Sequence, residues 1–350
     1  MALTVARASF GTLSDGRKVD AYTLDNGTVS ATVLSYGCII QSVLAPDRDG
    51  RREEITIAHD DIAAFEAGHP YFGALVGRCA NRIWGGGFEL DGTRYALATR
   101  PDGAHLHGGK RGFDKLLFDA QAESSPELAR VRFTAVSPDG DEGYPGTLQV
   151  AFELSLDDAN RLSLGFEAST DAPTIVNLTN HTYWNLGGSA TIVDHEVRLE
   201  ASRYMAYDRS MMPTGELPAV HDAFDLREWT RIGAGIDAGE LEVAGGYDHS
   251  FLVDGWSEAE FALRPAGAVR SPLSGRLMRV ATSYPDLHFY SGNNLSGQNG
   301  RGGVPLSGRE ALCMECQLLP DATNHDTFPS IVLRPDQHYR HQTVHEFTTY

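Results

Sequence analysis

The chain is poor in cysteine and has no long apolar run. Four cysteines occur in 350 residues, which is too few for a fold held together by disulfides. No stretch approaches the roughly 18 consecutive apolar residues that a membrane-spanning helix needs. The first ten residues lack the basic start and apolar run of a signal peptide. We therefore expect a cytoplasmic protein with reduced thiols.

Positive charge is also scarce. Lysine and arginine number 29 against 47 aspartates and glutamates, which gives a formal net charge of −18. Phosphate groups are bound by clustered cations, so neither nucleic acid nor an anionic membrane is an expected partner. A neutral small molecule is not excluded by this charge.

The sustained 3.6-residue periodicity of long helices is missing, and a period of two takes its place. Apolar and polar residues alternate in several runs, among them 131–135, 148–154 and 162–166. This alternation is typical of strands with one buried face. Clusters of aspartate, asparagine, glycine and proline separate the runs, as turns require.

These patterns predict an all-β fold: a large antiparallel β-sandwich with few short helices. One short helix is expected between His59 and Ala67, capped by Asp60 or Asp61. No linker, low-complexity tract or fixed-period repeat divides the chain, so we expect a single domain over residues 1–350.

The stretch from Asn177 to Gly188 combines amides, hydroxyls, an imidazole and two aromatic rings. Amides and hydroxyls can bind the hydroxyls of a sugar, and the rings of Tyr183 and Trp184 can pack on its C–H groups. His181 suits proton transfer because the ordinary pKa of imidazole lies nearest neutrality. The same residues also fit a polar loop with one structurally bonded histidine.

A second group of polar residues lies earlier in the chain. Asn81 and Arg82 can donate hydrogen bonds to sugar hydroxyls, and Gly108 and Gly109 would let the backbone approach a ligand beside His107. Each of these signals is weak alone, since an arginine is more often a surface ion-pair partner and a lone histidine is more often structural.

Two further segments contain candidate carboxylates. Asp248 can accept a hydrogen bond from a hydroxyl, or it can be a turn residue before a strand. Glu315 has apolar neighbours in sequence, and a carboxyl on a strand inside a pocket can have a raised pKa and act as a general base. Cys313 and Cys316 have Cys-x-x-Cys spacing, but zinc would need a second ligand pair and a strand would turn the two thiols to opposite faces.

Near the carboxy-terminal end, three histidines have the spacing of metal ligands on a helix. They are His338, His341 and His345. The segment follows a proline and leads into a predicted strand, so we interpret them as surface residues and expect no metal site.

Taken together and in this order, these segments resemble the aldose 1-epimerase (mutarotase) family over nearly the whole chain. The motifs that carry the resemblance are 80–83, 106–114, 177–181, 246–249 and 315–317. The resemblance implies a galactose-mutarotase-like supersandwich. It also implies an isomerase that interconverts the α and β anomers of a free aldose and needs neither a cofactor nor a metal.

The resemblance also implies roles for individual residues. Glu315 would be the base on the C1 hydroxyl, and His181 would be the acid on the ring oxygen. The sugar would be held by Asn81, Arg82, His107 and Asp248.

One position departs from the family pattern. His288 stands where many members have glutamine, and a neutral imidazole offers its donor and acceptor in a different geometry. We expect His288 to contact the substrate and to affect the sugar preference, which stays open between galactose, glucose, xylose and arabinose. A monosaccharide is the expected partner, and the protein is expected to be a monomer or a homodimer.

Three alternative functions would require different residues. A hexose-6-phosphate epimerase of the same fold would need several cations around C6 of the sugar. A non-catalytic sugar-binding module would lack one member of the acid–base pair. A glycosidase would need two carboxylates about 5–10 Å apart, and the sequence offers one strongly placed candidate, Glu315.

Overall fold

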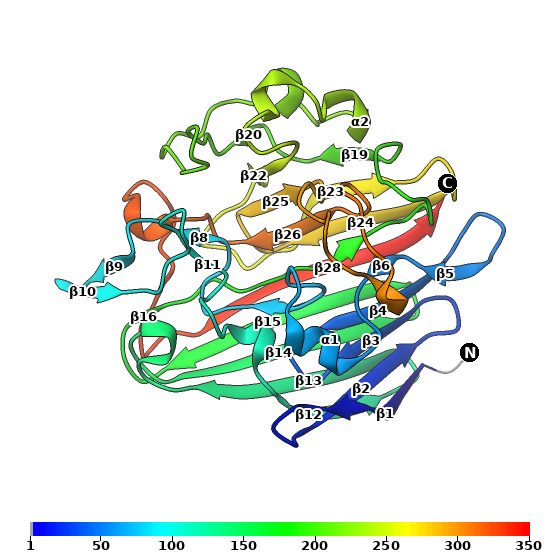
Figure 1. Ribbon diagram of the computed structural model, residues 1–350, viewed down its shortest axis with the longest axis horizontal. Helices are drawn as coiled ribbons and strands as arrows, with labels where there is room; N and C mark the ends of the chain where they lie inside the picture. The colour runs from blue at the N-terminus through cyan, green and yellow to red at the C-terminus, as the bar shows by residue number, and fades with distance from the viewer. Residues whose placement is uncertain (1–2) are drawn as a thin grey trace.

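The computed structural model describes residues 3–350, and antiparallel strands dominate it (Figure 1). The largest sheet has nine strands. In spatial order they are β12 (Asp119–Ser124), β13 (Leu128–Ser137), β14 (Leu148–Asp157), β15 (Arg161–Thr170), β28 (Tyr339–Thr349), β24 (Arg276–Thr282), β23 (Arg264–Arg270), β19 (Glu196–Leu199) and β21 (Thr230–Arg231).

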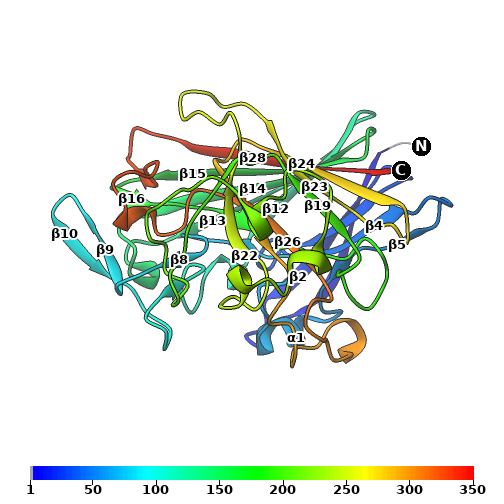
Figure 2. The same cartoon turned by 90° about the horizontal axis from the view of Figure 1, so that it is seen from above.

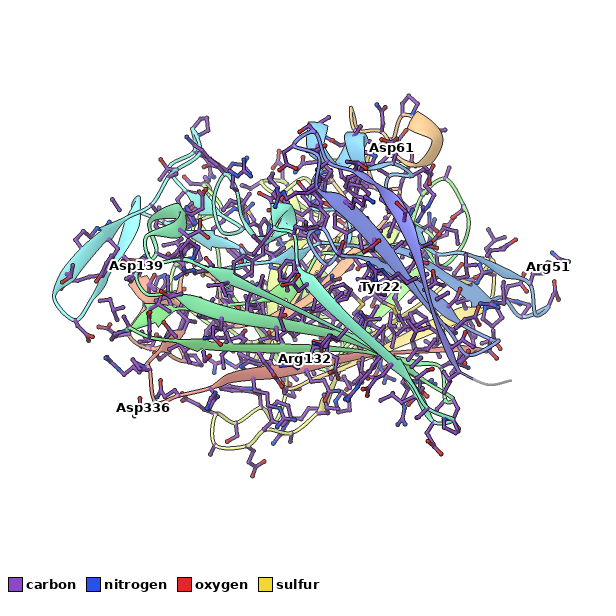
Figure 3. All side chains as sticks on the ribbon, turned by 90° about the horizontal axis from the view of Figure 1, so that it is seen from below. Tyr22, Arg51, Asp61, Arg132, Asp139 and Asp336 are labelled. Atoms are coloured by element: carbon purple, nitrogen blue, oxygen red, sulfur yellow. The ribbon has the colours of Figure 1, made fainter. Side chains whose placement is uncertain are left out.

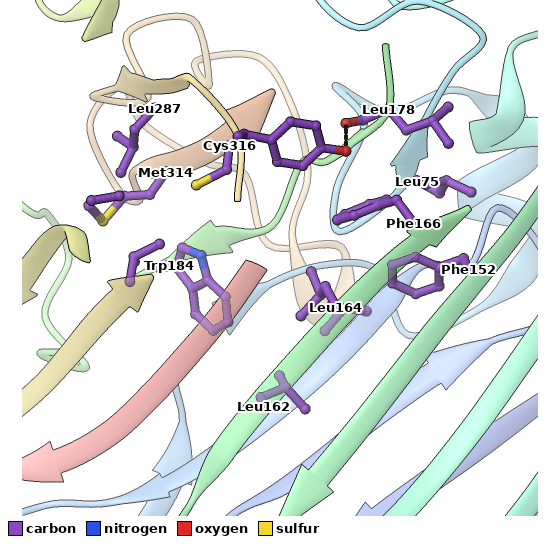
Figure 4. Close-up of a cluster of buried hydrophobic side chains, with 14 of the residues drawn as sticks. Leu75, Phe152, Leu162, Leu164, Phe166, Leu178, Trp184, Leu287, Met314 and Cys316 are labelled. Atoms are coloured by element: carbon purple, nitrogen blue, oxygen red, sulfur yellow. Dashed lines mark hydrogen bonds between the residues drawn. The ribbon is translucent and has the colours of Figure 1, made fainter. Parts of the chain in front are cut away.

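The alternation seen in the sequence decides which face of this sheet is buried. In β15, Leu162, Leu164 and Phe166 are at most 1% exposed, while the residues between them are partly exposed. Figure 4 shows these side chains on one face of β15, beside Phe152 of β14. The predicted period-two strands are therefore confirmed here.

Two smaller sheets pack against the buried face. The five-stranded sheet contains β1 (Thr4–Thr12), β2 (Lys18–Asp25), β3 (Ser30–Leu34), β4 (Ile40–Pro46) and β5 (Arg52–Glu54). The four-stranded sheet contains β20 (Arg203–Tyr204), β22 (Asp248–Leu252), β25 (Asp286–Tyr290) and β26 (Cys313–Gln317).

The contacts between the sheets make one continuous apolar interior. Tyr22 of β2 packs edge-on against Phe133 of β13, with the ring centroids 5.8 Å apart. Met314 and Cys316 of β26 belong to the same buried cluster as the β15 side chains (Figure 4). In contrast, Arg132 lies on the outer face of the large sheet (Figure 3). This arrangement confirms the all-β antiparallel sandwich.

The remaining elements are short. The small strand pairs are β6 (Thr56–Ile57) with β18 (Tyr183–Trp184), β7 (Leu75–Val76) with β17 (Thr179–Asn180), β8 (Arg82–Ile83) with β11 (His105–Leu106), β9 (Gly87–Leu90) with β10 (Thr93–Ala96), and β16 (Thr174–Ile175) with β27 (Val332–Leu333). The short helices are α1 (Ile62–Ala67) and α2 (Ile232–Gly235), with 3-10 turns at 113–115, 141–143, 222–224, 239–241, 301–303 and 322–324. No helix within residues 3–350 has the length and apolar character that crossing a bilayer requires.

The expected short helix is present as α1. Asp61 is its N-cap, because its carboxylate accepts a hydrogen bond of 2.8 Å from the backbone N–H of Ala64. Asp60 instead accepts from the backbone N–H of Gly302. Seen from above, α1 lies beyond β22 and β26, on the side away from β28 (Figure 2).

The interpretation of the C-terminal histidines as surface residues was wrong for two of the three. All three lie in or beside β28, where alternate side chains turn inward. His345 is 3% exposed and packs against Trp184, with ring centroids 5.2 Å apart. His341 is half-buried and stacks on Tyr284, while His338 is exposed as expected. The sequence pattern missed this because an imidazole is compatible with either face of a strand.

Candidate active site

The four-stranded sheet gathers polar side chains on one face. Antiparallel register places Ser250 of β22 and Glu315 of β26 on either side of His288 in β25. Because side chains alternate along a strand, Asp248 and Asp286 share this face with them. Leu287, Met314 and Cys316 point to the other face, into the apolar interior. Cys313 belongs to a different buried cluster from Cys316, as a strand requires and a Cys-x-x-Cys metal site does not.

A cavity of about 240 Å³ opens over this face. Sites for drug-sized ligands occupy roughly 300–1,000 Å³, so the cavity suits a smaller molecule such as one sugar ring. All seven candidate residues line it: Asn81, Arg82, His107, His181, Asp248, His288 and Glu315. Six separate segments of the chain therefore meet at one cavity.

His181 and Glu315 face each other inside the cavity. The distance from His181 Nε2 to Glu315 Oε1 is 3.6 Å, and the two side chains are 8% and 2% exposed. The His181 ring is held between the rings of Tyr71 and Tyr183, with centroids 5.8 and 5.0 Å away and interplanar angles of 24°. An imidazole and a carboxyl group are therefore held close together in the cavity.

Burial pushes both groups toward their neutral forms. It lowers the pKa of His181 to about 4. It raises the pKa of Glu315 well above its ordinary value, and the negative charge of Asp248 adds to this effect. Both shifts favour a protonated carboxyl beside a neutral imidazole over an ion pair with the proton on His181.

Asp248 is kept ionised in the same cavity. Burial by itself would raise its pKa, but the Arg82 guanidinium and the hydrogen bond from His288 hold the pKa below its ordinary range. Arg82 Nη2 lies 3.4 Å from Asp248 Oδ2, and His288 Nε2 lies 2.8 Å from Oδ1. The cavity therefore contains two carboxyl groups, Glu315 and Asp248. The sequence offered only Glu315 as a strongly placed candidate, and this was the argument against a glycosidase.

Asn81 and His107 lock each other in place. The backbone N–H of His107 donates to the carbonyl oxygen of Asn81 at 3.0 Å, and the backbone N–H of Asn81 donates to His107 Nδ1 at 3.2 Å. Both residues have left-handed backbone conformations, with φ of 60° and 49°. Such conformations are costly away from glycine and tend to occur at functional sites.

This contact decides what His107 can do. Side-chain nitrogen and oxygen atoms of His107, His181 and Glu315 lie within 4.8 Å of one another, a spacing that a cation could use. However, Nδ1 of His107 accepts from Asn81, so a neutral ring carries its hydrogen on Nε2. His107 therefore offers the cavity a hydrogen-bond donor, and the three residues fit a metal ion poorly.

The glycines after His107 serve the protein backbone, which corrects the expectation that they let the backbone approach a ligand. A Cβ on Gly108 would lie 1.8 Å from the carbonyl oxygen of Gly77, and one on Gly109 would lie 2.2 Å from Glu142 Oε2. The absence of a side chain at Gly108 thus allows close packing against the Gly77 segment, and its absence at Gly109 allows the close approach of Glu142.

We expect Gly108→Ala to destabilise the protein by about 3 kcal/mol, because it adds a backbone clash to left-handed strain. Thermal or denaturant unfolding measures the effect. Gly92→Ala is the matched control: Gly92 also has positive φ, but a Cβ there meets nothing within 4 Å, so it should cost only ~1 kcal/mol. Equal losses in the two variants would contradict the steric argument.

The polar residues before His181 are structural, which corrects their interpretation as sugar-binding groups. Asn177 exchanges two hydrogen bonds with the backbone of Leu318, at 2.9 and 2.8 Å. Thr179 donates to the carbonyl oxygen of Cys316 at 2.8 Å. These bonds tie the segment that carries His181 to the strand that carries Glu315. Trp184, expected to pack on a sugar, is 1% exposed in the apolar interior (Figure 4).

Several residues of the site were not anticipated. Tyr71, Arg100, Tyr290 and Asn294 also line the cavity, and their sequence contexts carry no signal for this. Ser250 and Asp286 lie behind His288, at positions that alternate with Asp248 in β22 and with His288 in β25. A polar residue two positions from a candidate site residue in the same strand lies on the same face, and this spacing is the sequence signal for Ser250 and Asp286.

Comparison with known proteins identifies the family of this chain. The aldose 1-epimerase family model matches residues 20–346. Galactose mutarotase of Homo sapiens is 39% identical over 350 residues, covering 99% of both chains. Aldose 1-epimerase of Escherichia coli (strain K12) is 32% identical over 340 residues, covering 95% of this chain and 96% of its own.

Solved structures agree as well. The galactose 1-epimerase from Lactobacillus acidophilus NCFM superimposes with a TM-score of 0.87 at 26% identity, covering 99% of both chains. An aldose epimerase homologue from C. elegans has a TM-score of 0.84 at 28% identity, again over 99% of both chains. The chain therefore belongs to the aldose 1-epimerase family and is an isomerase of that type.

Proposed function

We propose that the protein interconverts the α and β anomers of a free aldose by acid–base opening of the ring, with Glu315 as the base and His181 as the acid. The observation that carries this proposal is the buried pair itself. The 3.6 Å approach of His181 Nε2 and Glu315 Oε1 at the cavity supplies one carboxyl and one imidazole to a single sugar ring.

Ring opening needs one proton removed and one proton added. Glu315 takes the proton of the C1 hydroxyl, a C=O bond forms at C1, and the bond from C1 to the ring oxygen breaks. That oxygen takes a proton from His181. The aldehyde then turns about the C1–C2 bond, and the same steps in reverse close the ring as the other anomer. Each positioned group typically contributes a rate factor of roughly 10²–10⁴.

The protonation of the pair supports reversibility. Ring opening starts from ionised Glu315 with protonated His181 and ends with both groups neutral, and the number of protons on the pair is the same in both states. Burial favours the neutral state in the free protein, which is the state that accompanies the open-chain sugar.

The contacts of the cavity arginines favour a free sugar over a sugar phosphate. Arg82 pairs with Asp248, and Arg100 lies 3.4 Å from Asp102, so both have carboxylate partners. A phosphate would compete with these partners for the guanidinium groups. The relatives named galactose mutarotase suggest galactose as one substrate. We also propose a single domain, because the largest buried cluster joins strands of all three main sheets.

Asp248→Asn is expected to raise KM roughly 10- to 100-fold while kcat falls less, because a hydrogen bond to a charged group contributes about 1.5–3 kcal/mol to binding. Polarimetry at a series of sugar concentrations separates the two constants. Asp49→Asn, at an exposed turn, is the matched control and should change neither. A fall in kcat with KM unchanged would exclude a binding role for Asp248.

The proposed function is tested with freshly dissolved pure anomers. The optical rotation of α-galactose, α-glucose, α-xylose, β-arabinose and α-glucose 6-phosphate is followed with and without the protein. We expect faster approach to equilibrium for at least one free aldose and little acceleration for the phosphate. No acceleration with any of these sugars would overturn the proposal, and a preference for the phosphate would indicate a sugar-phosphate epimerase.

A further inference from the structure

A chain of buried polar side chains extends from the cavity into the interior of the protein. His288 Nδ1 lies 3.0 Å from Ser250 Oγ, on the side of the ring opposite Asp248. Ser250 Oγ lies 2.9 Å from Asp286 Oδ2, and Gln317 Nε2 donates to the same oxygen at 3.2 Å. Ser250, Asp286 and Gln317 are all 0% exposed, and His288 is 2% exposed.

Counting hydrogens restricts how this chain can be filled. His288 Nε2–H donates to the Asp248 carboxylate, so Nδ1 of a neutral ring is an acceptor. The single hydroxyl hydrogen of Ser250 can serve His288 or Asp286, but not both. If it serves a neutral His288, the contact between Ser250 and Asp286 needs a hydrogen from a protonated Asp286. If Asp286 is ionised, Ser250 donates its hydrogen to Asp286. The contact between Ser250 and His288 is then a hydrogen bond only when His288 carries a hydrogen on Nδ1 as well as on Nε2.

The surroundings of Asp286 favour its protonated form. No cationic side chain among residues 3–350 is in hydrogen-bond contact with Asp286. The titratable groups that face it are Tyr207, Glu315 and Cys316 from the neighbouring segments and His288 on its own strand. Asp248 and His249 lie on the adjacent strand β22. Burial raises the pKa of Asp286 to about 8.

We infer that Asp286 is a positioning residue, whose protonated carboxyl acts through Ser250 to keep His288 neutral and its Nε2–H directed at the sugar-binding carboxylate of Asp248. This inference rests on the proposed function for the role of Asp248. One hydrogen fills each contact from Asp286 to Ser250, from Ser250 to His288 and from His288 to Asp248. When Asp286 gives its proton to solvent, the Ser250 hydrogen turns to the new carboxylate, and Nδ1 of His288 loses its donor.

We call the hydrogen-bonded chain Asp286–Ser250–His288–Asp248 the relay. It predicts a rise in KM of roughly 3- to 10-fold as pH passes through about 8. Asp286→Asn should abolish this rise, because the carboxamide Nδ2 donates to Ser250 at every pH. Its second hydrogen can be accepted by Gln317 Oε1, which has no other partner among the described residues, once the Gln317 amide is flipped. Ser250→Ala should raise KM at all pH values and also abolish the step. Ser274→Ala is the matched control, since Ser274 is a buried serine bonded to the Leu186 carbonyl oxygen, outside the cavity. It should keep the wild-type step.

The measurement is KM and kcat by polarimetry from pH 6 to 10, with the ¹⁵N chemical shifts of the His288 ring followed in parallel. A structural role alone would change KM equally at all pH values. The inference is overturned if wild-type KM shows no step, or if a folded Asp286→Asn or Ser250→Ala variant keeps it. If the wild type fails to mutarotate any sugar, the proposed function fails instead. The ¹⁵N shifts then test the relay alone. His288 Nδ1 should lose its hydrogen bond as pH rises in the wild type and should keep it in Asp286→Asn.

Discussion

Glu315→Gln is expected to lower kcat for mutarotation by about 10³-fold, within the range typical of a positioned general base. The carboxamide has nearly the shape of the carboxyl but cannot take the proton from the C1 hydroxyl. Glu315 is 2% exposed and lies beside His288 in the lining of the cavity, so the change removes chemistry without removing volume. KM should change far less than kcat, because the other sugar contacts remain.

The same variant should be at least as stable as the wild type at neutral pH. The folded protein raises the pKa of Glu315 well above its unfolded value. Between those two values the folded state binds more protons, so the free energy of unfolding falls as pH rises through the window. Glutamine does not titrate, and the variant should lose this slope. Glu346→Gln, on the outer face of β28, is the matched control for activity. Near-parental kcat in folded Glu315→Gln would remove Glu315 from the role of base.

His181→Asn is the second large expected effect, with a fall in kcat of roughly 10²- to 10³-fold. The ring between Tyr71 and Tyr183 places Nε2 beside Glu315, and asparagine cannot donate a proton to the ring oxygen as an imidazolium does. Because the two groups act as a unit, the double variant should be little slower than the slower single variant. Multiplicative losses would indicate independent roles.

The acid side of the pH profile gives a second measure of His181. Its pKa is lowered to about 4 by burial. Below that value the pair holds two protons, no base remains, and kcat of the wild type should fall. The His181→Asn variant should lack this limb. His221→Asn is the control, since the His221 side chain is half exposed and lies outside the cavity lining. A wild-type acid limb that survives unchanged in His181→Asn would assign it to another group.

The site shows how far local sequence can predict function. His181 and Glu315 were identified because their motifs are short and contiguous. Asn177 and Thr179 belong to the same motif but bond to the backbone of β26, and a sequence cannot distinguish a side chain that binds a ligand from one that binds a neighbouring strand. The relay behind His288 was missed for a related reason, since Ser250, His288 and Gln317 become neighbours only through the register of three strands.

The sequence by itself predicted the strands around 131–135, 148–154 and 162–166 and their buried faces, because a period of two is a local property of the extended backbone. It also determined which residue types could exchange protons with a sugar. Only the tertiary structure decided that His345 is buried, that Trp184 faces the interior, and that Asp286 reaches the site through Ser250. These outcomes depend on strand register and sheet packing between distant segments, where burial sets which protonation states and hydrogen-bond partners are possible.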